Sequence, residues 1–165
     1  MNEETSMTEM EKGSEGQKEG LIMLGCPEAA AQVSVALHIA HGLRKMGLVP
    51  VVAGNPSARS LVAMADPDRH YVGEMVDLDA CIEALVTHEQ DYAVSFVLIH
   101  RESGVSYAGT VGSVSTGRLV AVVFGKEAGE LAGLIDFPCE RVVAKAVHNV
   151  LPLSKDIDRV MGWDA

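Results

Sequence analysis

The sequence is poor in aromatic residues, in cysteine and in basic residues. Aromatics make up only 4% of its 165 residues, so the core has to be built from Val, Ala, Leu and Ile, which suits a layered α/β fold. Three cysteines placed far apart do not form a disulfide framework, so we expect reduced thiols in a cytoplasmic protein. Because only 13 Lys and Arg face 23 Asp and Glu, the chain lacks the basic surface that binds phosphate backbones, and no nucleic-acid partner is expected.

Long hydrophobic runs are also absent. No stretch approaches the roughly 18 apolar residues of a membrane span, so we expect no membrane association. The start of the chain has no basic segment followed by an apolar one, which argues against a signal peptide. Residues 1–20 carry six Glu and two Lys and few apolar side chains, which predicts a disordered acidic tail before a single domain over 21–165. A regulatory or partner-binding arm is the alternative interpretation of this tail.

From residue 20 onwards, short apolar runs alternate with amphipathic segments. The runs predict strands at 20–24, 49–53, 92–99, 118–124 and 141–146, and residues 71–76 are ambiguous. The amphipathic segments predict helices at 28–46, 56–65, 78–87, 103–116, 126–134 and 154–161. This alternation predicts a three-layer α/β/α domain around a mostly parallel, open sheet of about five strands, of the Rossmann or flavodoxin type.

The first strand ends in a turn that predicts a site. Gly25 and Cys26 follow the strand, and Pro27 and Glu28 are typical of the first turn of a helix. Helix N-termini bind anions and favour the thiolate form of cysteine, so Cys26 is a candidate nucleophile. A well-capped structural turn with an inert thiol explains the same residues.

Five loops should converge at one edge of a parallel sheet, because all its strands then end on the same side. They are residues 25–28, 54–57, 100–107, 125–126 and 146–149. We therefore expect a ligand at this edge, contacted by residues from four of these loops: Gly25, Cys26, Asn55, His100, Ser106, Tyr107 and His148. The alternatives are structural: Asn55 as a helix N-cap, Ser103 as the cap of an ordinary polar loop, and His148 as a hydrogen-bonded anchor.

The known nucleotide motifs are missing from this chain. Neither the G-x-G-x-x-G fingerprint nor a Walker A loop occurs, and the second strand ends in Gly54 and Asn55 rather than in the acidic residue that holds the ribose of NAD. A nucleotide-like or phosphate-bearing ligand remains the leading expectation, and the sequence identifies no cofactor. Cysteine and histidine do not occur at the spacings of metal ligands, so no metal site is predicted.

Three functions are consistent with these features. The first is a small-molecule or cofactor-binding protein. The second is an enzyme that uses Cys26 as nucleophile, with His100 or His148 as proton carrier. The third is a non-catalytic accessory subunit or homodimer, in which the small-residue segment 109–117 or an apolar helix face meets a partner.

Several short motifs, in order, resemble a known family. They are Leu24-Gly-Cys-Pro-Glu28, Gly54-Asn-Pro56, Ala65-Asp-Pro67, Gly104-Val-Ser-Tyr107, Val123-Phe-Gly125 and His148-Asn149. The family consists of small methanogen proteins with a Rossmann-like fold, described as a domain of unknown function, and the resemblance spans residues 21–163. The resemblance implies an archaeal, cytoplasmic protein that takes part in the metabolism of methanogens. No reaction is attached to the family, so it identifies no catalytic residue.

Overall fold

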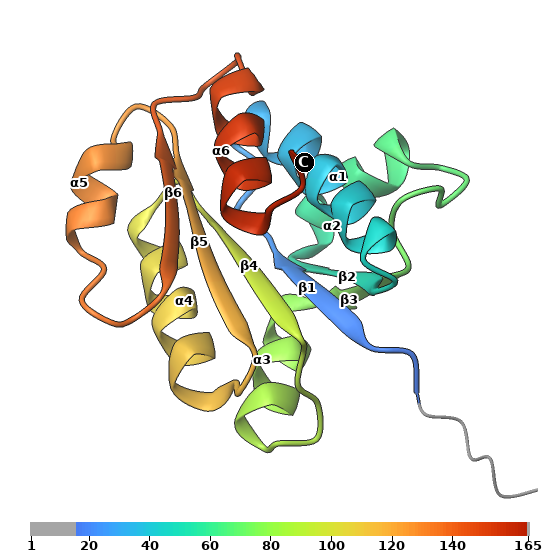
Figure 1. Ribbon diagram of the computed structural model, residues 1–165. Helices are drawn as coiled ribbons and strands as arrows, with labels where there is room; N and C mark the ends of the chain where they lie inside the picture. The colour runs from blue at the N-terminus through green and yellow to red at the C-terminus, as the bar shows by residue number, and fades with distance from the viewer. Residues whose placement is uncertain (1–15, 165) are drawn as a thin grey trace, which may run out of the picture.

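The computed structural model describes residues 16–164, in which six strands alternate with six helices (Figure 1). The strands are β1 (Glu19–Met23), β2 (Val49–Gly54), β3 (Glu74–Asp77), β4 (Val94–Ile99), β5 (Arg118–Phe124) and β6 (Glu140–Ala144). The helices are α1 (Ala31–Lys45), α2 (Pro56–Ala65), α3 (Leu78–Val86), α4 (Glu102–Val114), α5 (Ala128–Gly133) and α6 (Leu151–Met161). None of the helices in this part of the chain is long and apolar enough to cross a membrane.

Most of the predicted acidic tail, residues 1–15, lies outside the described residues. Glu19 of that predicted tail belongs to the sheet instead. It opens β1 opposite Val49 of β2, one residue before the predicted strand at 20–24. The folded domain therefore begins slightly earlier than the apolar pattern indicated.

The strands form one sheet in the order β3-β2-β1-β4-β5-β6, and every neighbouring pair is parallel. Ile22 of β1, for example, lies opposite Val52 on one side and Phe96 on the other. The predicted parallel α/β/α fold is confirmed, with six strands instead of about five. The added strand is β3, four residues at the edge of the sheet that lie within and just after the ambiguous segment and pair with β2.

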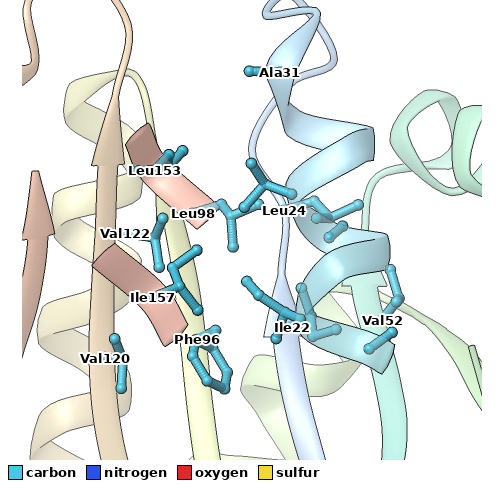
Figure 2. Packing of buried hydrophobic residues seen from close by; sticks show 14 of the residues in the cluster. Ile22, Leu24, Ala31, Val52, Phe96, Leu98, Val120, Val122, Leu153 and Ile157 are labelled. Carbon is cyan, nitrogen blue, oxygen red and sulfur yellow. The ribbon is translucent and has the colours of Figure 1, made fainter. Parts of the chain in front are cut away.

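Helices cover both faces of the sheet, as expected for a parallel sheet whose strands are apolar on both sides. Ile22 and Leu24 point into a first core beneath α1, α2 and α6, while Leu21 and Met23 point into a second core beneath α3, α4 and α5. Figure 2 shows the first core, where Leu153 and Ile157 of α6 lie over side chains of β4 and β5. Since three helices cover each face, no bare sheet face calls for a dimer among the described residues.

Four helices begin at positions other than those predicted; one of them is α5, which begins at Ala128 instead of residue 126. The signals at Pro27 and Glu28 belong to a turn, in which the Glu28 N–H donates to the Cys26 carbonyl, and α1 begins only at Ala31. In contrast, α4 begins early, directly after the strand, with Arg101 rather than Ser103 at the N-cap position. The last helix also begins early, at Leu151, because Pro152 fits its first turn.

The small residues of α4 serve packing inside the domain. A methyl group on Gly109 would lie 3.4 Å from the Phe137 ring, and one on Gly112 would lie 3.1 Å from Leu119. The helix thus approaches β5 and the segment after α5 closely because these glycines have no side chain. This packing explains why the segment 109–117 contains glycines that face the domain.

Candidate functional site

The carboxyl ends of the strands surround an open cleft of about 490 Å³. Four separate connections line it: Glu28 and Ala29 after β1, His100 and Arg101 after β4, Gly125 to Glu127 after β5, and Val147 after β6. β1 and β4 are adjacent in the sheet although they are not consecutive in the chain, so the strand order reverses between them. Open α/β sheets bind ligands at this reversal, outside the strand ends.

The wall of the cleft after β1 is held by a buried glutamine. The Gln32 side chain, only 1% exposed, accepts a hydrogen bond from the Gly25 N–H and donates one to the Gly25 carbonyl, both at 3.0 Å. Glycine at position 25 also leaves room for the imidazole, because a methyl group there would lie 3.0 Å from Cε1 of His100. A side chain of α1 thereby fixes the loop and leaves room for the imidazole beside it.

His100 is the unusual residue of this cleft. Its ring lies 5.4 Å from the Phe124 ring, centre to centre, and both ring nitrogens are buried without a hydrogen-bond partner. The pKa of His100 is lowered chiefly by burial; the Glu28 carboxylate and the nearby backbone of Cys26 oppose this shift, while Arg101 adds to it. The Cys26 backbone thus lies near the imidazole ring but forms no hydrogen bond with either ring nitrogen. The result is a neutral imidazole with one unsatisfied donor and one unsatisfied acceptor.

Cys26 and Asn55 meet beside this cleft. Asn55 caps α2 as predicted, since its Oδ1 accepts the Ala58 N–H at 2.8 Å, and its Nδ2 donates to Sγ of Cys26 at 3.8 Å. The Cys26 thiol is exposed. It does not lie at a helix N-terminus, because α1 starts only at Ala31, so the reason for expecting an activated thiolate is absent.

Charged side chains frame the opening. Arg101 forms an ion pair with Glu28, so the connections after β1 and β4 are bridged across the reversal point. Lys126 and Glu127 stand on the β5 side of the same cleft. A second hollow of about 440 Å³ continues between α4 and α5, and it shares Arg101 and Glu127 with the cleft.

The other predicted contacts lie farther out. Ser106 and Tyr107 belong to α4, as the predicted helix over 103–116 requires, so the overlapping loop over 100–107 ends at Arg101; Ser106 is exposed, and Tyr107 packs against the second core. His148 is exposed and lines a neighbouring hollow of about 500 Å³, which shares Val147 with the cleft. The structure therefore brings Gly25, Cys26, Asn55 and His100 together and leaves these three at the periphery.

Three residues of the site were not named as contacts from the sequence. Arg101 and Lys126 belong to the strand-end loops 100–107 and 125–126 that were predicted to converge, although only other residues of the edge were chosen as contacts. Gln32 gave no signal, because its role depends on reaching back to Gly25 from the helix that follows. No group of three His, Cys, Asp or Glu side chains within residues 16–164 could hold a metal ion.

Two solved structures are similar to this fold. The chain superimposes on the structure of MT0777 with a TM-score of 0.82 and 32% identity, covering 90% of this chain and 99% of that one. It also superimposes on a xanthine dehydrogenase, BH1974, from Bacillus halodurans with a TM-score of 0.54. That second likeness covers 89% of this chain and 43% of that one at 13% identity, so it concerns the fold alone.

The sequence comparisons agree with the resemblance of the short motifs. Over 145 residues the chain is 29% identical to Uncharacterized protein MJ0452 of Methanocaldococcus jannaschii, covering 86% of this chain and 95% of the relative. A family model, the domain of unknown function DUF1890, matches residues 21–160, which include every strand-end loop that lines the cleft. The chain belongs to this DUF1890 family.

Proposed function

We propose that this protein binds a small phosphate-bearing molecule, such as a nucleotide, in the cleft between the ends of β1, β4 and β5. The observation that carries the proposal is His100, whose two buried ring nitrogens lack partners beside an open cleft. A buried polar group without a hydrogen bond costs roughly 1–3 kcal/mol, and a ligand in the cleft would supply the missing partner. The methanogen relative suggests that the ligand belongs to the metabolism of such organisms.

The position and size of the cleft support the same proposal. It lies where the strand order reverses, which is the usual ligand position in this fold class. Its volume of about 490 Å³ is within the range of roughly 300–1,000 Å³ that small-molecule sites occupy. The Gly25–Gln32 hydrogen bonds hold one wall in place, which reduces the entropy lost when a ligand binds.

Mass spectrometry tests this proposal directly. The protein is incubated with a small-molecule extract of methanogen cells, desalted, and compared under native and denaturing conditions, together with its ultraviolet–visible spectrum. We expect a retained mass that is lost in His100→Asn and kept in the control His88→Asn, which alters an exposed histidine away from the cleft. If no variant retains a mass, or if His100→Asn retains the same mass, the proposal is refuted.

A thiol-dependent enzyme is the second candidate, favoured by the exposed Cys26 thiol and its contact with the Asn55 amide. Its test is the pH profile of alkylation of Cys26 by iodoacetamide, with Cys26→Ser as the reference. A midpoint near the ordinary thiol value of about 8.5 would argue against this candidate. The homodimer, as a third candidate, is tested by light scattering at high protein concentration, where a monomer mass would exclude it.

A further inference from the structure

We propose that Arg101 is the anion-binding residue of the cleft and that Glu28 is an internal counter-ion, which the anionic group of a ligand displaces. This inference rests on the proposed function and adds to it the chemical class of the group that is recognised. It assigns the ion pair at the reversal point a role in selecting ligands. The ligand then has one negatively charged group near Arg101 and an organic part in the adjoining hollow.

The first argument is the position and exposure of the ion pair. Glu28 lies in the connection after β1 and Arg101 lies in the connection after β4, so the pair spans the crevice between the two strands. Their side chains are 62% exposed for Arg101 and 51% exposed for Glu28. Exposed pairs of this kind contribute little, because water screens both charges, so replacing Glu28 by another anion is inexpensive. The planar guanidinium can bind a phosphate or carboxylate through two parallel hydrogen bonds.

The second argument is the unequal capping of the helices. α2 and α3 have side-chain caps, from Asn55 and Asp77, whereas α1, α4, α5 and α6 have none. Of the uncapped helices, α1 and α4 begin on either side of the crevice. Their first N–H groups and the positive ends of their dipoles therefore favour an anion there. His100, whose buried ring nitrogens lack partners, lines the same cleft, so unsatisfied hydrogen-bonding groups and positive potential lie close together.

The third argument concerns the remaining charges. Lys126 lines the cleft and forms no ion pair with any residue of the described chain, so a second cation is available. Glu127 also lines the cleft, and Glu102 lies in the first turn of α4. These two carboxylates limit how much negative charge the site accepts. Together with the hollow that adjoins Arg101, they favour a monoester phosphate or a carboxylate attached to an organic group over a highly charged anion.

Phosphate titration of the full-length protein tests this inference. Inorganic phosphate is added at constant ionic strength and followed by NMR at the backbone amides of Glu28, Arg101 and Lys126. We expect Glu28→Gln to bind phosphate about twofold to fivefold more tightly, which corresponds to the loss of an exposed competing pair. Arg101→Gln is expected to bind about tenfold more weakly, because charged hydrogen bonds are lost. Two controls alter the net charge equally at exposed positions elsewhere, Glu83→Gln on α3 and Arg159→Gln on α6, and should match the unaltered protein.

The outcomes separate this inference from the proposed function. If Glu28→Gln binds no more tightly than Glu83→Gln, or if Arg101→Gln binds as well as Arg159→Gln, the inference is refuted. It also fails if phosphate leaves all three amides unperturbed. In each of these cases the proposed function still stands if a mass from the cell extract is retained through His100. Retention of that mass by the unaltered protein and its loss in Arg101→Gln would support both.

Discussion

Replacing Gly25 by alanine should strain the cleft without altering the rest of the fold. The new methyl group would lie 3.0 Å from Cε1 of His100, whereas unstrained carbon contacts are roughly 3.5–4.0 Å. Gly25 is not one of the glycines with a positive φ, so its backbone accepts alanine and the cost comes from the contact. Overpacking of this size costs roughly 1–3 kcal/mol, and the lower entropy of the unfolded alanine chain offsets about 0.5 kcal/mol. We expect Gly25→Ala to lower the free energy of unfolding by about 1–2 kcal/mol.

A double-mutant cycle with His100 isolates this contact. In a His100→Ala background the ring is gone, so Gly25→Ala should cost nearly nothing, and the coupling energy should be about 1 kcal/mol or more. Urea unfolding followed by circular dichroism measures all four proteins. Gly129→Ala is the control, since a methyl group at this helical position in α5 meets no atom within 4 Å and should be neutral or stabilising. Equal costs of Gly25→Ala in the two backgrounds would show that the imidazole is not packed against this glycine.

Three further predictions follow from particular contacts. Burial lowers the pKa of His100 from 6.5, so this histidine binds a proton more readily in the unfolded chain, and the free energy of unfolding should fall as the pH drops below about 6.5. Urea unfolding at pH 7.5 and 5.5 measures this loss, and His100→Asn should remove the part of it that comes from His100. For Asp91, burial raises the pKa, but hydrogen bonds from Ser115, Thr116 and the Tyr92 N–H outweigh it and bring the pKa to about 2. The stabilisation from Asp91 should therefore be complete above about pH 4 and be lost as the pH falls towards 2. Asp91→Asn should lower the free energy of unfolding by about 1 kcal/mol at neutral pH, a small value because the carboxylate is exposed to solvent. The same substitution should flatten the acid unfolding curve between about pH 4 and 2. Gly42→Ala would place a methyl group 2.3 Å from the Trp163 ring, so it should displace the only tryptophan, shift its fluorescence maximum to longer wavelength and cost about 2 kcal/mol; an unchanged emission spectrum would contradict this packing.

The layers of the fold could be predicted because the strands are short apolar runs and the helices are amphipathic. β4 is the clearest case: all six of its residues are buried, as a central parallel strand requires. β3 could not be predicted with the same rule, because its four residues are half-buried or exposed and it forms only by pairing with β2. The strand order is likewise not encoded locally, since parallel strands pair through backbone groups that every residue carries.

The place of the candidate cleft was easier to predict than the residues around it. Any residue that follows a parallel strand reaches the same edge, and Gly25, Asn55 and His100 lie beside the cleft or its rim, while their contact with a ligand stays a prediction. Tyr107 lies farther out, because α4 begins at Glu102 and carries that residue along the helix. The pairing of Glu28 with Arg101 joins residues 73 positions apart, and no local pattern records such a contact.

The Gln32 amide has a mechanical consequence for ligand entry. By donating to and accepting from Gly25, it gives this glycine both of the hydrogen bonds that a neighbouring strand would give it, and so extends the rigidity of the sheet two residues beyond β1. The wall of the cleft after β1 is therefore rigid. The opposite side is also fixed at its glycine, since the Gly125 N–H donates to the Ala146 carbonyl and the Gly125 carbonyl accepts from the Ala128 N–H. Under the proposed function, a ligand therefore meets fixed backbone on both sides of the cleft and is selected by its shape.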